Sequence, residues 1–220
     1  VSVVRTIVHR AAAHGIYTLL DMHQDVFSSR FCLYDGVPLW VANKSTSAHA
    51  FPWPLRGDCA SRGWEANALT EAAATAYQDL YDNKDGMLDD LAAFWAETAQ
   101  RFVGEPAVLG YEIMNEPFAV CPQRTRADWH ACFVDPWLVY THILGQRVSL
   151  RPPALSATCG RLRRQGNFFA DPALLLPGVA GRSNLQRMYD HVASAIRAHD
   201  ERHLVFYEPV TCAQPLTDLT

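Results

Sequence analysis

Three short groups of polar residues each follow an apolar run in this chain, and their side chains are of the types used in acid/base chemistry. The groups are Asp21, His23 and Asp25, then Asn115 and Glu116, then Glu208. If the runs are parallel strands, the groups meet at one edge, where α/β barrels keep their chemistry. Carboxyls beside an amide and an imidazole suit hydrolysis of a glycosidic bond. One carboxyl protonates the leaving oxygen, and a second, roughly 5 to 5.5 Å away, attacks the anomeric carbon.

The Asn-Glu-Pro corner is the most informative of these groups. Pro117 has no N–H to give to a sheet ladder, so the strand expected at 108–114 must end there. Asn115 and Glu116 then lie at the carboxyl end of a strand. The alternative is structural, with Asn115 capping the next helix and Glu116 merely solvated. These residues alone leave both interpretations open.

Helix, strand and polar corner follow one another three times along the chain. The expected helices are 1–14, 88–102 and 183–198, and the expected strands are 16–20, 108–114 and 203–208. Gly15 and Gly104 stand where helix-ending glycines belong, and Ser183 and Gln186 have the spacing of a capping box. One side of the second helix is expected to hold Leu91, Phe94, Trp95, Thr98 and Phe102. The alternation predicts an α/β fold with a parallel sheet and right-handed crossovers.

The connection at 25–64 is unusually long for a compact domain, and loops of this length are usually functional. It carries Trp40, Phe51 and Trp53. These rings either form a platform for sugar or lipid, or they pack the loop against the rim of the barrel.

The composition is that of an ordinary globular protein, with 220 residues, 49% hydrophobic, 19% charged and a net charge of −4. It gives no sign of nucleic-acid binding, and no apolar run reaches the length of a membrane span. The six cysteines show no CxxC pair and no zinc spacing. Cys32 and Cys59 could pair, which would favour an oxidising compartment, either outside the cell or in a lysosome-like or vacuole-like lumen. Free thiols are the alternative.

Several motifs occur in order along the chain: Leu-Asp-Met-His-Gln-Asp-Val-Phe-Ser at 20–28, Asp-Gly-Val-Pro-Leu-Trp at 35–40, Phe-Pro-Trp-Pro-Leu at 51–55, Tyr-Asp-Asn-Lys-Asp-Gly at 81–86, Leu-Gly-Tyr-Glu-Ile-Met-Asn-Glu-Pro at 109–117 and Phe-Tyr-Glu-Pro-Val at 206–210. In these motifs the chain resembles the endoglycoceramidases, a branch of glycoside hydrolase family 5. The resemblance implies an α/β fold, a partial (β/α)8 TIM barrel holding roughly strands 3 to 6. Residues 1–220 would be a single partial catalytic domain.

The resemblance also implies roles for individual residues. Glu116 would be the acid/base, Asn115 would hold the sugar 2-hydroxyl, and His23 and Asp25 would line the sugar site. The reaction would be retaining hydrolysis of the β-glycosidic bond between glycan and ceramide, without a metal or organic cofactor. The partners would be a glycolipid or oligosaccharide and, at the periphery, a membrane surface.

The nucleophile of the resembled family is a Glu in a Glu-x-Gly context on the seventh strand, and no such strand is found in this chain. It is expected beyond Thr220. Glu208 is the other candidate, but it is expected to end the sixth strand and to support the site. The chain therefore resembles a fragment that would be inactive alone.

Residues 120–165 interrupt one motif with an arginine-rich stretch that has no periodicity. Without them, Ala119 would run directly into Gly166 and restore the family pattern. Val codons begin with GT and a Gln codon can be CAG, which are the two ends of an intron. We expect a translated intron here, placed after the fourth strand. A genuine lineage-specific loop is the alternative.

Two other functions share part of this pattern. A family 5 β-glucanase or steryl-glucosidase would share Asn115 and Glu116 but would not need the motifs at 35–40 and 51–55. An inactive carbohydrate- or lipid-binding pseudoenzyme would explain why the nucleophile is not found.

Overall fold

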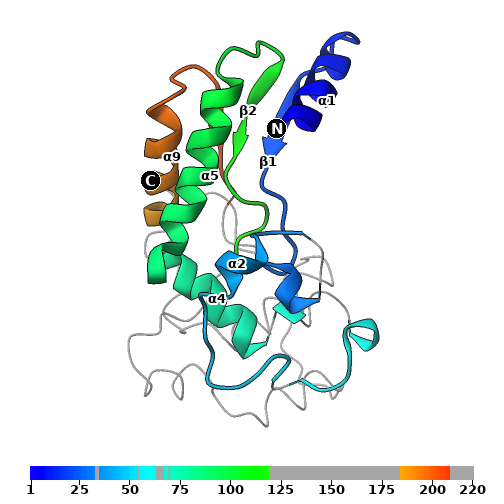
Figure 1. Ribbon diagram of the computed structural model, residues 1–220, viewed down its shortest axis with the longest axis vertical. Coiled ribbons are helices and arrows are strands. Elements are labelled where there is room, and N and C mark those ends of the chain that lie inside the picture. The colour runs from blue at the N-terminus through cyan, green and yellow to red at the C-terminus, as the bar shows by residue number, and fades with distance from the viewer. Residues whose placement is uncertain (33–34, 54, 63–66, 69, 119–183, 209–220) are drawn as a thin grey trace, which may run out of the picture.

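The computed structural model describes residues 1–32, 35–53, 55–62, 67–68, 70–118 and 184–208. Within these ranges, three strands form one sheet: β1 Thr18–Asp21, β2 Val108–Glu112 and β3 Leu204–Phe206. Their order is β1-β2-β3 and both pairings are parallel (Figure 1). The predicted α/β pattern with a parallel sheet is confirmed.

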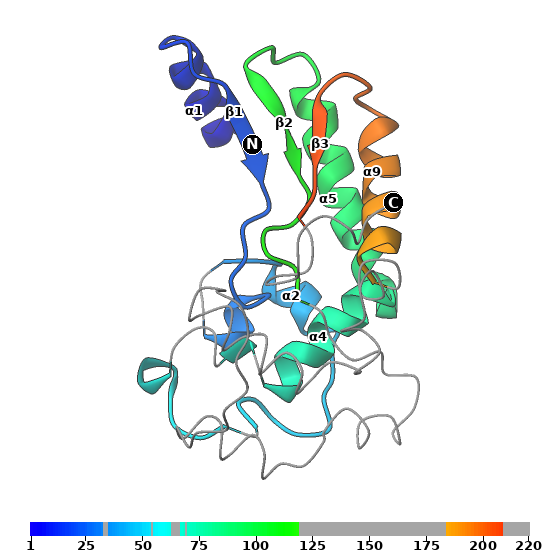
Figure 2. The same ribbon diagram turned by 180° about the vertical axis from the view of Figure 1, so that it is seen from behind.

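Five helices and three short 3-10 helices accompany the sheet in the described residues. The helices are α1 Ser2–Ala12, α2 Leu39–Ala42, α4 Glu71–Tyr81, α5 Met87–Phe102 and α9 Gln186–Arg197. The 3-10 helices are η1 Ser29–Phe31, η2 Cys59–Ser61 and η3 Lys84–Gly86. Figures 1 and 2 show α5 and α9 side by side over one face of the sheet. The strands run toward the region of α2 and α4, so that region lies beyond their carboxyl ends.

The direct pairing of β3 with β2 corrects the expected strand numbering. Gly110 of β2 is in register with Leu204 of β3, and no strand lies between them. Neighbouring strands of a (β/α)8 barrel are consecutive in sequence. β2 and β3 would then be consecutive strands, so that Glu208 follows the fifth strand if β2 is the fourth, and not the sixth as expected.

Helix α1 ends as its sequence predicted. Gly15 has a φ of +72°, a left-handed conformation that glycine adopts without strain. The Ile16 N–H donates to the Ala11 carbonyl at 3.0 Å and the Gly15 N–H donates to the Ala12 carbonyl at 2.9 Å, which is the Schellman pattern. Of the apolar residues on this helix, Val8 is the buried one.

Helix α5 is the main support of the sheet. Trp95 is almost completely buried, and its indole N–H donates to the Ile113 carbonyl at 3.0 Å. Phe94, expected on the same side, is instead 48% exposed. One residue corresponds to about 100° around a helix, so Phe94 falls outside the buried stripe that contains Trp95.

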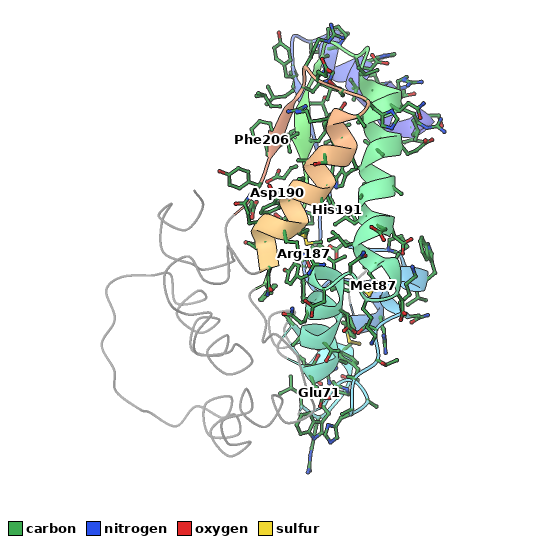
Figure 3. All side chains as sticks on the ribbon, turned by 90° about the vertical axis from the view of Figure 1, so that its left-hand side faces the viewer. Glu71, Met87, Arg187, Asp190, His191 and Phe206 are labelled. Carbon is green, nitrogen blue, oxygen red and sulfur yellow. A yellow bond between two sulfur atoms is a disulfide. The ribbon has the colours of Figure 1, made fainter. Side chains whose placement is uncertain are left out.

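Helix α9 packs along α5, and Figure 3 shows His191 on the side that faces α5. His191 Nε2 lies 2.9 Å from Asp89 Oδ1 of α5. The expected capping box of Ser183 and Gln186 stays a prediction, because only one of its two residues is described. Leu185 is the N-cap and makes no side-chain cap hydrogen bond, while the Gln186 side chain donates to Asp190. Ser183 lies outside the described residues.

Strand β2 ends at Glu112, two residues before the expected end. Beyond Glu112 the pairing continues as single backbone hydrogen bonds: the Ile113 N–H donates to the Phe206 carbonyl at 3.2 Å, and the Asn115 N–H donates to the Met22 carbonyl at 3.1 Å. The regular strand therefore ends before Pro117 is reached.

A buried polar network closes the amino-terminal side of the sheet. Asp200 is fully buried and accepts hydrogen bonds from the Tyr111 hydroxyl at 2.7 Å and from the backbone of Arg202 and His203. Burial alone would raise the pKa of Asp200, but the hydrogen bonds from His203, Tyr111 and the two backbone N–H groups outweigh it and hold that pKa well below its usual range. The network fixes the turn between α9 and β3 to β2.

In the part of the chain that the structure describes, no helix combines the length and apolar character that crossing a bilayer requires.

Gly110 is required by the close approach of β2 and β3. A Cβ at this position would lie 2.2 Å from the Leu204 carbonyl oxygen, which is a backbone atom and cannot rotate away. Gly104 differs, because nothing lies within 4 Å of a Cβ placed there.

We expect Gly110→Ala to lower the free energy of unfolding of the full-length protein by about 1 to 3 kcal/mol or more, because the two strands must separate. The matched variant Gly104→Ala should stay within about 0.5 kcal/mol of the unsubstituted protein. Urea unfolding followed by tryptophan fluorescence measures both. Equal stabilities of the two variants would contradict the close approach of the strands.

Candidate active site

Carboxyl groups gather where the three parallel strands end. The register places Asp21 of β1 beside Glu112 of β2, and Glu112 beside Phe206 of β3. Glu208 follows β3, two residues after Phe206. The sequence-predicted groups do converge: the Glu116 N–H donates to Glu208 Oε2 at 2.8 Å.

His23 links two carboxylates at the end of β1. Its Nδ1 lies 3.1 Å from Asp21 Oδ2, and its Nε2 lies 3.7 Å from Asp25 Oδ1. Burial acts to lower the pKa of His23, but the hydrogen bond and charge of Asp21, followed by the charge of Asp25, raise it overall. The pKa values of Asp21 and Asp25 are themselves raised, chiefly by burial. The His23 side chain is 56% exposed, so it remains open to a ligand.

Gln24 holds the corner after β1 against the corner after β2. It is fully buried, and its Nε2 donates to the Asn115 carbonyl at 2.6 Å and to the Glu116 carbonyl at 3.0 Å. Its Oε1 accepts from the Phe27 N–H and from the Tyr77 hydroxyl. In return, Asn115 Nδ2 donates to the Gln24 carbonyl at 3.0 Å. The sequence interpretation missed this residue, although a glutamine just before the apolar Val26-Phe27 pair was a usable signal.

Glu116 has an unusual backbone that is held from both sides. Its φ is +42°, in the left-handed region that residues other than glycine rarely adopt. Glu208 accepts its N–H and Gln24 donates to its carbonyl. Burial first, then the negative charges of Glu208 and Asp25, raise the pKa of Glu116. A raised pKa favours the protonated form of the carboxyl, which is the form that a general acid needs.

Glu112 is a second carboxyl that the sequence interpretation missed. Burial is the largest cause that raises its pKa to about 7, followed by a hydrogen bond with the Glu208 side chain and by the charges of Asp21 and Glu208. The available signal was a charged residue inside an otherwise apolar strand.

Two tyrosines of α4 contact Phe118, in the corner that follows β2. The Tyr81 hydroxyl donates to the Phe118 carbonyl at 2.9 Å, and the Tyr77 ring lies 5.4 Å from the Phe118 ring. From α9, the Tyr189 hydroxyl donates to the Glu208 carbonyl at 2.5 Å. Helix α4 had not been predicted from the sequence.

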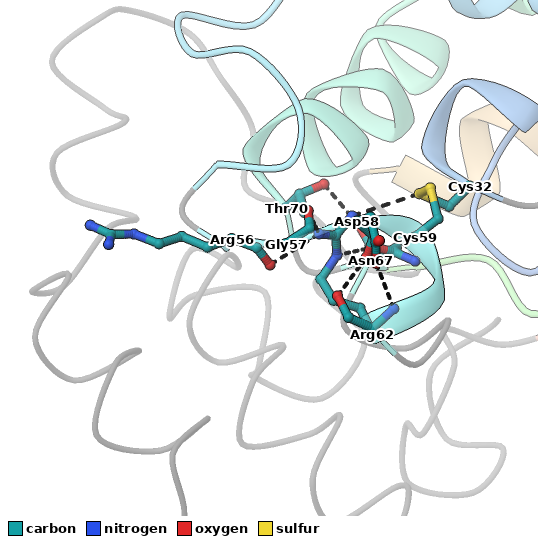
Figure 4. The surroundings of a disulfide bond; sticks show 9 residues. Cys32, Arg56, Gly57, Asp58, Cys59, Arg62, Asn67 and Thr70 are labelled. Carbon is teal, nitrogen blue, oxygen red and sulfur yellow. Dashed lines mark hydrogen bonds between the residues drawn. A yellow bond between two sulfur atoms is a disulfide. The ribbon is translucent and has the colours of Figure 1, made fainter.

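The long connection after β1 is fastened by the disulfide Cys32–Cys59, which confirms the pairing that the sequence left open. Figure 4 shows Arg62 beside it. The Arg62 guanidinium donates to Asn67 Oδ1 at 2.8 Å, to the Arg56 carbonyl at 3.0 Å and to Cys32 Sγ at 3.7 Å. The other four cysteines lie outside the described residues.

Some aromatic residues of this connection pack within the protein, and one is exposed and could form part of a platform for sugar or lipid. Phe51 packs inward, with its ring 5.5 Å from Phe31, and Trp53 stacks on His49 at 4.1 Å. Trp40 is 60% exposed.

Among the described residues, the ligand atoms of His23, Asp25 and Asp35 lie within 4.8 Å of one another, a spacing that a metal ion could use. The same carboxylates and imidazole suit the hydroxyls of a sugar, which both donate and accept hydrogen bonds.

We expect Gln24→Leu to destabilise the full-length protein by about 2 to 4 kcal/mol, because it leaves the Phe27 N–H, the Tyr77 hydroxyl and two carbonyls of the second corner without their partner. Gln100→Leu, on the exposed side of α5, is the matched control and should change stability little. Thermal unfolding measures both. If the two variants unfold alike, Gln24 does not hold the corners together.

The comparisons with known proteins agree with this geometry. The profile of the family described as Cellulase (glycosyl hydrolase family 5) matches residues 1–218. The endoglycoceramidase of Hydra vulgaris is 39% identical over 225 residues, covering 96% of this chain and 34% of that protein. The endoglycoceramidase of Cyanea nozakii is 37% identical over 223 residues, covering 95% of this chain and 35% of that protein. The chain therefore spans about a third of the length of the curated relatives that it matches.

Among solved structures, endo-glycoceramidase II from Rhodococcus sp. in its ganglioside GM3 complex is similar with a TM-score of 0.58 and 20% identity, covering 95% of this chain and 36% of that chain. Its cellobiose-like imidazole complex gives a TM-score of 0.58 and 21% identity, covering 95% of this chain and 35% of that chain. At this identity the likeness concerns the fold, a TIM barrel in which the three strands are neighbours. The family profile spans nearly the whole chain, and the chain belongs to glycosyl hydrolase family 5.

Proposed function

We propose that this chain is part of a retaining glycoside hydrolase that cleaves the β-glycosidic bond between the glycan and the ceramide of glycosphingolipids. The observation that carries the proposal is the Glu116 corner, where a carboxyl with a raised pKa is fixed by Glu208 and Gln24 at the end of a barrel strand. The substrate class rests on the two relatives named endoglycoceramidase.

In the proposed reaction, Glu116 gives its proton to the oxygen that links the sugar to the lipid. A second carboxylate attacks the anomeric carbon and forms a glycosyl-enzyme. Glu116, now ionised, then takes a proton from the water that releases the glycan. Asn115 would accept the sugar 2-hydroxyl with its side-chain oxygen, because its Nδ2 already donates to Gln24. His23 and Asp25 would hold hydroxyls of the same sugar.

We place the nucleophile outside these residues, beyond Thr220 in the full-length protein. Glu208 is the alternative, but its carboxyl already accepts the Glu116 N–H and pairs with Glu112. Those contacts favour a supporting role for Glu208.

We further propose that the described strands are the third, fourth and fifth of the barrel and that 1–220 is a single partial catalytic domain. Leu19 and Leu204 lie on the strand face away from α5 and α9, flank Gly110, and are 36% and 53% exposed. That apolar face would be covered in a closed barrel. With this face uncovered and no nucleophile assigned within it, the 220-residue chain should be poorly soluble and inactive alone.

Contact with a lipid surface would suit Leu39 and Trp40 of α2. They are 50% and 60% exposed, and Lys44 lies over the Trp40 ring at 5.3 Å. A tryptophan beside a lysine is a common pairing at membrane interfaces.

Residues 120–165 lie outside the described residues. We propose that they are a translated intron. We expect a transcript in which the codon for Ala119 is joined directly to that for Gly166. Abundant peptides from within this segment in the isolated protein would favour a genuine loop instead.

We expect Glu116→Gln in the full-length protein to reduce glycan release by about 10²- to 10⁴-fold and to leave substrate binding in place, because the amide cannot transfer the proton. Chromatography of the glycan released from a ganglioside in detergent micelles measures the rate, and calorimetry measures binding. Glu201→Gln, exposed before β3, is the matched control.

Surviving activity in Glu116→Gln would show that the acid/base assignment is wrong. Substrate comparison separates the alternatives: cleavage of cello-oligosaccharides or steryl glucosides in preference to glycosphingolipids would favour the β-glucanase or steryl-glucosidase. Binding without turnover on all three substrates would favour the pseudoenzyme.

A further inference from the structure

The carboxyls of Glu112 and Glu208 meet at the carboxyl ends of β2 and β3. Glu112 is in register with Phe206, and Glu208 lies two residues after Phe206, just beyond the end of β3. The two side chains are within hydrogen-bonding reach of each other. Two carboxyls this close cannot both be ionised without strong repulsion, whereas one proton between them makes a short and strong hydrogen bond.

The groups around this pair favour keeping the proton. On the β1 side, the negative charge of Asp21 raises the pKa of Glu112, and the charge of His23 lowers it. From the second corner, Glu116 lies close enough to sense the charge of Glu208. From α9, the neighbouring group is the Tyr189 hydroxyl, which donates to the Glu208 carbonyl rather than to the pair. Among the described residues, the groups that shift the pKa of Glu112 include no lysine or arginine.

Glu208 connects the pair to the backbone of Glu116. Its Oε2 accepts the Glu116 N–H at 2.8 Å, and Glu116 has the left-handed φ of +42°. A residue other than glycine keeps that conformation only when its surroundings impose it. The position of the Glu208 carboxyl therefore sets the position of the proposed acid/base.

We propose that Glu112 and Glu208 hold one proton between them and that Glu112, acting through Glu208, is a positioning residue for Glu116. The sharing of the proton rests on the strand register, on the Glu208–Glu116 hydrogen bond and on the contact between the two carboxyls, whereas the positioning role rests on the proposed function.

The pH dependence follows from the raised pKa of Glu112, about 7, which burial causes first and the hydrogen bond with Glu208 second. Below this pH the pair keeps its proton and Glu208 stays on the Glu116 N–H. Above it both carboxyls are ionised, they repel each other, and Glu208 is driven from that position. The ordered state of Glu116 is thus present at lower pH and is lost as the pH rises through about 7.

Infrared difference spectroscopy of the full-length protein tests the shared proton without any substrate. The unsubstituted protein should show a protonated-carboxyl band that disappears as the pH rises through about 7. The band should be missing in both Glu112→Gln and Glu208→Gln, each combined with Glu116→Gln so that the carboxyl of the proposed acid adds no band of its own. It should remain in the matched control Glu97→Gln, because Glu97 is half-exposed and pairs with Arg101 on α5. A missing band in the unsubstituted protein, or a band that survives in Glu112→Gln combined with Glu116→Gln, would overturn the proposal.

The pH profile of glycan release tests the positioning role. The amide that Glu112→Gln introduces can donate to Glu208 at every pH, so the alkaline limb of kcat should move to higher pH by about one unit or more. Glu112→Leu offers no hydrogen bond, and its kcat should fall by on the order of a hundredfold with a smaller change in KM. A merely structural role would lower the melting temperature and leave the limb of Glu112→Gln where it was, and that result would sink the positioning role. If the unsubstituted protein releases no glycan at any pH, the proposed function fails, and the infrared result still decides whether the proton is shared.

Discussion

The buried amide of Gln24 is the interaction on which the geometry of the site depends. Its two ends bind four groups: the carbonyls of Asn115 and Glu116 on one side, and the Phe27 N–H and Tyr77 hydroxyl on the other. β1 and β2 are paired through a short ladder, and beyond it the Asn115 N–H donates to the Met22 carbonyl at 3.1 Å. A fully satisfied buried network gives the corners after these strands one arrangement, because every alternative leaves a polar group without a partner.

The parallel strands bring several carboxyl groups to one edge of the sheet, where they can act as acids but also repel one another. The register that places Asp21 beside Glu112 also brings Glu208 and Glu116 to the same edge, so like charges accumulate at the ends of the strands. Burial and the neighbouring negative charges raise the pKa values of Asp21, Glu112 and Glu116, which opposes their ionisation and favours proton donors. The same neighbouring negative charges that raise the pKa of Glu116 also raise that of Glu112.

The sequence predicted what depends on local pattern. Apolar runs followed by polar corners predicted the three strands and the convergence of Glu116 with Glu208, and Gly15 predicted the end of α1. Helix α4 was not predicted because it is buried on nearly every side. Its sequence therefore lacks the alternation of polar and apolar faces that marks an amphipathic helix. The roles of Gln24 and Glu112 were not predicted because they depend on partners about 90 residues away in the sequence, which no local pattern reveals.

The contacts of Glu208 bear on where the attacking carboxylate must lie in the proposed reaction. A retaining pair stands roughly 5 to 5.5 Å apart with the sugar carbon between the two carboxyls. Glu208 is fixed instead against the backbone of Glu116 itself, with Glu112 at its other side and Tyr189 holding its carbonyl. Moving it into an attacking position would release the left-handed backbone of the acid that must act in the same step. The attack is therefore better supplied by a carboxylate from another strand that approaches the sugar from the opposite side of the barrel.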